Sequence, residues 1–125
     1  MAQLKKIGVV GAGNMGSGIV QKLAQEGFDV VMQDLTSAFV ARGRARIRAL
    51  LGEAVERKIF TPAQVDEILA RIYDTTSLEE LADCDYVIEA VFEDETVKKE
   101  LFAGLDKICG PETVLATNTS SFSVT

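Results

Sequence analysis

Glycine residues crowd directly behind an apolar run near the start of the chain, in the stretch IGVVGAGNMGSG. Four of them, Gly11, Gly13, Gly16 and Gly18, fall within eight positions, although an interior glycine weakens a helix or strand by about 0.5–1 kcal/mol. In a GxGxxG pattern between a strand and a helix, the first glycine permits a tight turn and the second lets a diphosphate approach the backbone. The third lets the helix pack closely on the strand. The free N–H groups and positive dipole end at the helix start would attract the same anion.

A carboxylate stands where the rest of this pattern needs one. Asp34 lies 18 residues beyond Gly16, at the expected end of a second strand, where it can accept hydrogen bonds from both ribose hydroxyls of an adenosine. Its charge would repel a 2′-phosphate, and neighbouring Leu35 and Thr36 supply no arginine to attract one. The pattern predicts NAD rather than NADP, bound by Gly11, Ala12, Gly13, Asn14, Met15, Gly16 and Asp34. Two alternatives stay open: a flavin dinucleotide, or a glycine turn without a ligand beside a solvated Asp34.

The elements that must position these residues alternate between strands and helices. Apolar runs predict strands over residues 5–10, 28–33, 71–75, 85–91 and 113–117. Helical spacing predicts helices over 14–26, 37–58 and 94–108, with Gly27 ending the first. Capping boxes at Thr61-Pro62-Ala63-Gln64 and Ser77-Leu78-Glu79-Glu80 predict two further helices, the second a short one ending near Cys84. We therefore expect an α/β fold, a Rossmann-type doubly wound parallel sheet covered by helices on both faces, with a helical pair inserted after the second strand.

Composition narrows the classes of protein and partner. A chain of 125 residues suits one domain, covering residues 1–125, and its net charge of −6 argues against a nucleic-acid surface. The apolar runs fall short of the ~20 residues that a membrane helix needs, and the amino-terminal stretch lacks a signal-peptide cleavage pattern, so we expect a cytoplasmic protein. The two cysteines, Cys84 and Cys109, have no metal-ligand spacing and the sequence holds no histidine. We expect both thiols to be reduced and no metal to be bound.

The missing histidine also limits the chemistry. No Ser-His or Cys-His constellation can be assembled from these 125 residues. A dehydrogenase that oxidises an alcohol needs a group to take the hydroxyl proton as hydride leaves, and histidine suits that task at neutral pH. The base must then be a lysine, tyrosine, aspartate or glutamate, or lie on chain outside this sequence.

Three stretches in a fixed order resemble the amino-terminal domain of L-3-hydroxyacyl-CoA dehydrogenases. They read IGVVGAGNMGSGIVQKLAQEGFDVVMQD, DCDYVIEAVFEDETVKKELFAGLDKI and TVLATNTSSFSVT, and the likeness spans the whole chain. The series GAGxMGxGI, EAVFEDExVKKELF and NTSS is far more specific than the glycines alone. The resemblance implies a dinucleotide-binding domain of an enzyme that reversibly oxidises the 3-hydroxyl of an acyl-CoA with NAD.

Matched position by position, the family pattern implies roles for further residues. It puts Glu93 and Lys98 near the cofactor, and Ser120 of the stretch Asn118-Thr119-Ser120-Ser121 where a family serine binds substrate and cofactor at the reacting oxygen. Asn118 is included among the cofactor-binding positions. Without the resemblance, Glu93 and Lys98 read as a surface ion pair and NTSS as an ordinary turn.

A basic segment and one acid stay open to two interpretations. Arg42, Arg44, Arg46 and Arg48 form the densest basic stretch, which is either a solvated helix face or a phosphate-attracting one. In the family, the helical pair lies beside the CoA moiety, and the resemblance makes Arg57, with Lys58, a candidate contact for the CoA phosphates. Leu50 replaces a serine common at one CoA-contacting position. Glu89, within the fourth strand, is a buried acid to which no role is assigned.

Parts of the family pattern do not occur in these residues. A His-Phe-Phe-Asn-Pro type segment with the catalytic histidine, its partner glutamate and a helical domain are all missing, so we expect NAD binding without turnover. The last strand would form a sheet edge, and unpaired edges invite self-association, for example as a homodimer. Two other functions remain open, namely a related dehydrogenase of a hydroxy acid or sugar acid, and a stand-alone NAD(H)-sensing module.

Overall fold

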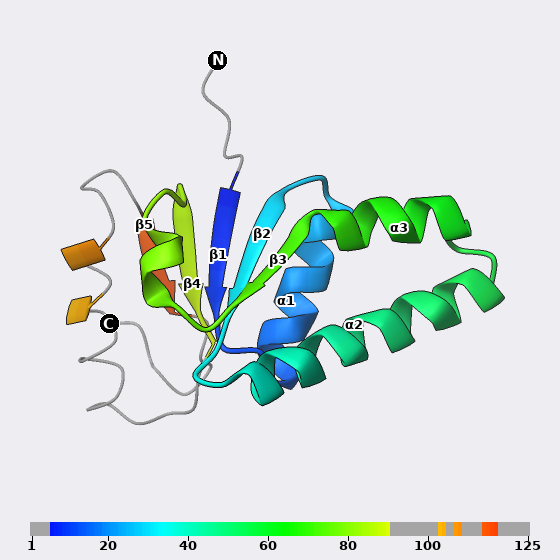
Figure 1. Ribbon diagram of the computed structural model, residues 1–125. Helices are drawn as coiled ribbons and strands as arrows, with labels where there is room; N and C mark the ends of the chain where they lie inside the picture. Colours follow the sequence, from blue (N-terminus) through cyan, green and yellow to red (C-terminus); the bar gives the residue numbers. More distant parts are fainter. Residues whose placement is uncertain (1–5, 91–102, 105–106, 109–113, 118–125) are drawn as a thin grey trace, which may run out of the picture.

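Five parallel strands form one sheet in the computed structural model, which describes residues 6–90, 103–104, 107–108 and 114–117 (Figure 1). The strands are β1 (Lys6–Val10), β2 (Asp29–Gln33), β3 (Ile72–Thr75), β4 (Tyr86–Glu89) and β5 (Val114–Thr117). Their order is β3-β2-β1-β4-β5, and every neighbouring pair is parallel. The chain therefore starts in the middle of the sheet and winds outward in both directions, which confirms the predicted Rossmann-type doubly wound sheet.

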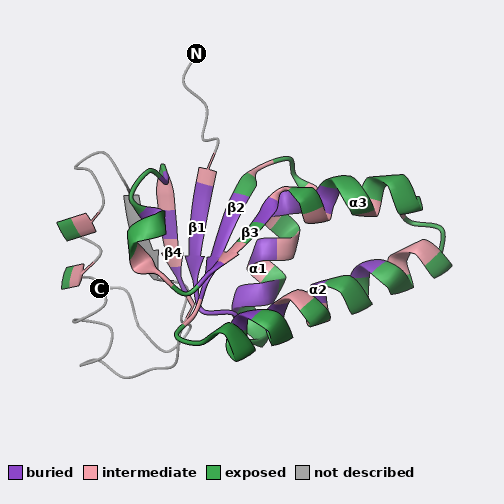
Figure 2. Cartoon of the chain, viewed as in Figure 1, coloured by how far each residue is buried: buried purple, intermediate pink, exposed green. Residues whose placement is uncertain are grey.

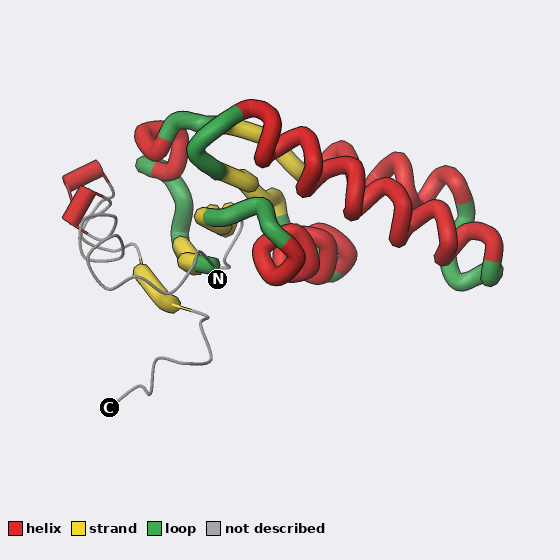
Figure 3. Tube along the Cα trace, turned by 90° about the horizontal axis from the view of Figure 1, so that it is seen from below, coloured by secondary structure: helices red, strands yellow, loops and turns green. Residues whose placement is uncertain are grey.

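Three helices pack together against one side of the sheet. They are α1 (Asn14–Gln25), α2 (Ser37–Glu56) and α3 (Pro62–Ala70), and the last two form the predicted helical pair after the second strand. Figures 1 and 3 show α2 and α3 side by side, extending away from the sheet. A short 3₁₀ helix, η1 (Leu78–Leu81), packs on the other face. Most of the helix predicted over 94–108 lies outside the described residues.

Alternating side chains of the strands build two separate cores. Val9, Val30 and Met32 face the helices and pack with buried residues such as Val20 and Ile47. The alternate residues face η1, where the buried residues are Val10, Val31, Leu81, Cys84 and Val87. This two-sided burial is what a parallel sheet requires, and Figure 2 shows the buried stripes along the strands and the inner sides of the helices. Cys84 is buried in this second core, as expected for a structural cysteine.

Local capping signals had different outcomes at the two predicted boxes. The Thr61 side chain accepts from the backbone N–H of Gln64, and the Gln64 side chain accepts in return from the backbone N–H of Thr61, which confirms the first box. The second box is wrong, because Ser77 makes no side-chain cap bond and η1 is a 3₁₀ turn. Thr75 instead bonds to both ends of the predicted box: its hydroxyl donates to Glu80 Oε1 at 2.8 Å and accepts from the Ser77 N–H at 3.0 Å.

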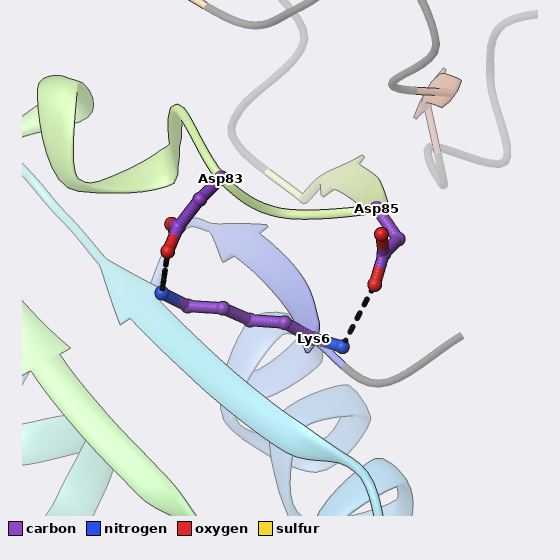
Figure 4. A network of polar contacts seen from close by, with 3 residues as sticks. All are labelled: Lys6, Asp83 and Asp85. Atoms are coloured by element: carbon purple, nitrogen blue, oxygen red, sulfur yellow. Dashed lines mark hydrogen bonds and ion pairs between the residues drawn. The ribbon is translucent and has the colours of Figure 1, made fainter. Parts of the chain in front are cut away.

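A polar network fastens the amino end of β1 to the segment before β4 (Figure 4). The Lys6 ammonium donates to both carboxylate oxygens of Asp83, at 2.7 and 2.8 Å, and the Lys6 N–H donates to Asp85 Oδ2 at 3.2 Å. The hydrogen bond with Asp83 raises the pKa of Lys6, and the same bond lowers the pKa of Asp83. This network lies at the opposite end of the sheet from the glycine-rich stretch, so its role is structural.

Candidate dinucleotide site

The glycine-rich loop turns sharply where β1 ends. Gly11 has a φ of 111°, a backbone conformation that residues other than glycine rarely adopt. Its N–H donates to the carbonyl of Gln33 at 2.7 Å, so the loop leaves the sheet still tied to β2. The start of α1, the start of α2 and the carboxyl ends of β1, β2 and β4 lie at the same edge of the sheet (Figure 1). Ligands of doubly wound sheets bind at this edge, beside the point where the winding reverses.

Gly16 lets the first turn of α1 lie directly on this loop. A Cβ at this position would lie 1.7 Å from the carbonyl oxygen of Gly11 and 2.6 Å from its carbon. No side chain can occupy that space unless the helix moves. The third glycine of the pattern therefore has the packing role that its spacing predicts.

Gly13 differs from Gly16 because a side chain there would meet none of the described residues. Apart from its two chain neighbours, no atom of the described residues lies within 4 Å of a Cβ built at Gly13, which is exposed and forms the N-cap of α1. No side chain caps the helix, and its first turn contains no acidic residue. Asn14 and Met15 beside it are exposed as well. Free N–H groups and the positive end of the helix dipole thus face open space, which fits the diphosphate of a dinucleotide.

Asp34 stands beside this loop at the end of β2. Its Oδ2 accepts from the N–H of Ala12 at 2.8 Å, and its Oδ1 accepts from the N–H of Leu35 at 2.7 Å. An ionised carboxylate has about four acceptor positions, so the half-buried Asp34 keeps capacity for the hydroxyls of a ribose. The structure thus brings the predicted acid against the predicted loop. Sequence reasoning missed that this carboxylate also holds the Ala12 amide.

The helix α2 closes the other side of the loop through two residues. A Cβ at Gly43 would lie 2.7 Å from the carbonyl oxygen of Ala12 and 2.9 Å from the Ala12 Cβ, so α2 packs on the loop backbone. One turn later, Arg46 Nη1 donates to the same carbonyl oxygen at 3.1 Å. Gly43 was missed from the sequence. The signal that could have found it is a glycine within the buried stripe Val40, Gly43, Ile47 and Leu51.

The other arginines of the basic segment divide between structural contacts and the surface. Arg44 donates to both carboxylate oxygens of Asp74, at 2.6 and 2.9 Å, and to the carbonyl of Ile72 at 2.7 Å. It therefore ties α2 to β3. Arg42 lies over the ring of Phe39 at 5.4 Å from the ring centre, and Arg48 is exposed. Arg44 and Arg46 therefore have structural contacts, and attraction of a phosphate by the exposed Arg42 and Arg48 stays a prediction.

The structure does not bring every predicted residue to this edge. Arg57 is exposed at the carboxyl end of α2, a helix of 20 residues whose first turn lies near the loop, and Leu50 is half exposed on the same helix. Glu89 is fully buried at the end of β4, in register with Val10 of β1. Four predicted site residues lie outside the described residues and stay predictions: Glu93, Lys98, Asn118 and Ser120.

Two kinds of site are not found in the part of the chain that the structure describes. Within the ranges given above, no helix is both long enough and apolar enough to cross a membrane. Within the same ranges, no group of three or more cysteine and acidic side chains could hold a metal ion.

Comparison with known proteins agrees with this geometry. Residues 6–125 match the family model described as 3-hydroxyacyl-CoA dehydrogenase, NAD binding domain. The chain is similar to a probable 3-hydroxybutyryl-CoA dehydrogenase of Deinococcus radiodurans, with 47% identity over 96% of this chain and 43% of the relative. It is also similar to the alpha subunit of the fatty acid oxidation complex of Acinetobacter baumannii, with 43% identity over 94% of this chain and 16% of that subunit.

Solved structures give the same result. The crystal structure of (S)-3-hydroxybutyryl-CoA dehydrogenase from Ralstonia eutropha superposes with a TM-score of 0.95 and 38% identity, covering 98% of this chain and 44% of that one. The chain therefore spans less than half the length of the dehydrogenases that it matches. The resemblance drawn from the three motifs is confirmed, and so is NAD as the family's cofactor. This chain belongs to the NAD-binding domain family of the 3-hydroxyacyl-CoA dehydrogenases.

Proposed function

We propose that these 125 residues form the NAD-binding domain of an oxidoreductase that interconverts L-3-hydroxyacyl-CoA and 3-oxoacyl-CoA by hydride transfer. The observation that carries the proposal is the pairing of two features at one edge of the sheet. Gly13 leaves an uncapped helix start open, and the Asp34 carboxylate lies against the same loop. Such a pairing suits a ligand with a diphosphate and an adjoining ribose.

Each described residue has a separate task in binding. The amides at the start of α1 donate to the diphosphate beside Gly13, where no side chain intervenes. Asp34 accepts hydrogen bonds from the adenosine ribose, and its charge disfavours a 2′-phosphate. Gly11 and Gly16 shape the turn that brings these groups together. NAD is therefore preferred over NADP.

The reaction itself needs groups beyond the described residues. When bound, NAD supplies the nicotinamide that accepts the hydride from the 3-hydroxyl carbon. By family resemblance, Glu93, Lys98, Asn118 and Ser120 contact the cofactor, and Ser120 also holds the reacting oxygen. The 125 residues contain no histidine, and the matched dehydrogenases are more than twice as long as the matching part. We therefore place the base that takes the hydroxyl proton, and the rest of the acyl pocket, on chain outside these residues.

Contacts with CoA, location and assembly are part of the same proposal. Exposed Arg57 at the end of α2 is a candidate contact for the CoA phosphates. A cytoplasmic location is in keeping with the metabolic relatives.

Among the described strands β5 lies at one edge of the sheet, so a second copy or further chain would cover it. A stable monomer in sedimentation would argue against self-association through this edge.

The proposal is tested by titrating NAD and NADP into the chain in a calorimeter. NAD should bind saturably and NADP about tenfold or more weakly, because Asp34 opposes the additional phosphate. Asp34→Asn keeps an oxygen for the Ala12 amide but removes the charge. It should therefore reduce the difference in affinity between NAD and NADP. Asp29→Asn, at the amino end of the same strand, is the matched control and should leave the difference unchanged. Equal affinity for NAD and NADP in the unmodified chain would contradict the proposal.

Turnover supplies a second, separate test. The 125-residue chain with NAD and 3-hydroxybutyryl-CoA should produce no NADH above background, because the proton has no base. Detectable oxidation by these residues alone would refute the placement of that base elsewhere. It would leave the cofactor assignment intact.

A further inference from the structure

The peptide that joins Ala12 to Gly13 is held by an arginine from another element. Ala12 lies between Gly11 and Gly13, the two positions where the backbone rotates most freely. Its carbonyl oxygen accepts from Arg46 Nη1 at 3.1 Å, and its N–H donates to Asp34 at 2.8 Å. The loop is thus fixed from two sides, by the end of β2 and by α2.

The orientation of this peptide determines where the Gly13 amide points. The peptide bond is trans and planar, so the N–H of Gly13 points away from the carbonyl oxygen that Arg46 holds. The Arg46 guanidinium lies on the side of α2, and the Gly13 N–H is therefore directed to the opposite side of the loop. A cationic donor on the carbonyl also polarises the peptide, which makes its N–H a stronger donor.

Close packing at Gly43 is what brings Arg46 within reach. With no side chain at Gly43, the backbone of α2 lies against the Ala12 carbonyl, where a Cβ would be only 2.7 Å from the oxygen. Arg46 follows three residues later, almost one helical turn along the same side. Gly52, in the same helix, has no atom of the described residues beyond its own helix backbone within 4 Å of its Cβ position, so of these two glycines only Gly43 makes a close approach.

We propose that Arg46 and Gly43 are positioning residues that hold the Ala12–Gly13 peptide with its amide directed at the dinucleotide diphosphate. The inference rests on the proposed function, since it concerns affinity for the same ligand. It assigns to α2 a part of the affinity that the glycine pattern alone does not supply. The gain comes from an amide that is oriented before the ligand arrives.

The test compares two arginine variants that lose the same charge. Arg46→Met removes the bond to Ala12, whereas Arg48→Met removes an exposed arginine of the same helix. Calorimetry would follow NAD, ADP-ribose and adenosine, of which adenosine has no phosphate. We expect Arg46→Met to lower the affinity for NAD and for ADP-ribose about tenfold, the change that 1.4 kcal/mol produces. The affinity for adenosine should stay within about twofold. Arg48→Met should leave all three ligands within about twofold.

Two further variants keep the proposal falsifiable if Arg46→Met does not fold. Arg46→Lys keeps the charge without the planar fork, and should recover part of the lost affinity. Gly43→Ala should lower the affinity for ADP-ribose but not that for adenosine, whereas Gly52→Ala should change neither affinity. In the ligand-free chain, the amide resonance of Gly13 should shift in Arg46→Met and Gly43→Ala more than in their controls.

The outcomes separate this inference from the proposed function. If the unmodified chain binds NAD and both Arg46→Met and Gly43→Ala bind it as their controls do, the positioning role is wrong and the proposed function stands. Equal weakening of adenosine and ADP-ribose would mean general damage to the domain and would also overturn the positioning role. If the unmodified chain does not bind NAD, the proposed function fails, and this inference fails with it.

Discussion

Replacing Gly16 by alanine should destabilise the domain far more than the same change at Gly18, two residues later in α1. A Cβ at Gly16 would stand 1.7 Å from the carbonyl oxygen of Gly11. One at Gly18 would meet no atom within 4 Å among the described residues beyond its own helix backbone. Both glycines lie in the same helix, between Asn14 and Gln25. The two variants therefore differ in packing and hardly at all in chemistry.

The size of the effect follows from two opposing contributions. Alanine is the better helix former, so Gly18→Ala should stabilise the domain by about 0.5–1 kcal/mol. At Gly16 the helix must move by more than an ångström against backbone that cannot yield, and insertion of a group into a packed site costs about 1–3 kcal/mol or more. Alanine favours the helix at both positions, so this gain cancels and the variants differ by the packing cost, about 1–3 kcal/mol or more in the free energy of unfolding.

Urea unfolding followed by circular dichroism measures this difference directly. We expect the urea concentration at the unfolding midpoint to fall for Gly16→Ala and to rise slightly for Gly18→Ala. The free energy of unfolding should depend on urea concentration with a similar slope in both variants. In thermal unfolding, a loss of 1 kcal/mol corresponds to about 3–6 °C for a domain of this size. If Gly16→Ala matched or exceeded the stability of Gly18→Ala, the close contact between α1 and the end of β1 would be wrong.

Two other predictions concern capping and pH. Thr61→Ala removes a complete capping box and should destabilise the domain by about 1 kcal/mol in the same urea assay. Ser77→Ala loses no cap bond and should change the stability by no more than about 0.5 kcal/mol. Similar losses in both variants would contradict the assignment of the capping box to Thr61 alone of the two. Because the folded-state pKa of Asp83 is lowered and that of Lys6 is raised, their pair should stabilise the fold above the ordinary carboxyl value of 3.8 and below the ordinary ammonium value of 10.5. Asp83→Asn should therefore lower the free energy of unfolding by up to about 1 kcal/mol at pH 7 and by nothing once pH has fallen through the lowered pKa. Asp66→Asn, at an exposed position, is the control. An undiminished effect at pH 2 would exclude the pair as its cause.

Local signals predicted the elements well because their causes lie within a few residues. Gly27 follows the end of α1 with a φ of 101°, as expected for a glycine that stops a helix. The Thr61 box formed because both of its partners belong to the same turn. The Ser77 box failed because Glu80 is engaged by Thr75, a residue before the box that the local pattern does not include.

Contacts between distant segments were beyond the reach of a single sequence. Arg42, Arg44, Arg46 and Arg48 read as one basic stretch, but a step of two residues turns a helix by more than half a revolution, so neighbours in this series face different ways. Arg44 consequently reaches Asp74 while Arg46 reaches Ala12. Which partner each would meet depends on how α2 crosses the sheet.

In the candidate site, too, local features were predictable from the sequence and contacts between distant segments were not. The glycine spacing and the acid at the end of β2 were predictable, because the pattern reflects chemistry that a dinucleotide demands. The Asp34 bond to Ala12 and the close packing of Gly43 were not, since each joins the loop to an element more than 20 residues away. The groups proposed to face the ligand were therefore predictable from the sequence, and the contacts that support them were not.

The most direct test of the account is calorimetric titration of NAD into the unmodified chain and into Gly13→Ala. A methyl group at Gly13 would lie clear of the described residues other than its chain neighbours, and φ there is −73°. The variant should therefore fold with a loss of at most about 1 kcal/mol from the poorer helix cap. The methyl group would occupy the space assigned to the diphosphate, so NAD affinity should fall at least about tenfold while adenosine affinity stays the same. Unchanged NAD affinity in a normally folded Gly13→Ala chain would contradict the claim that the diphosphate binds at this loop.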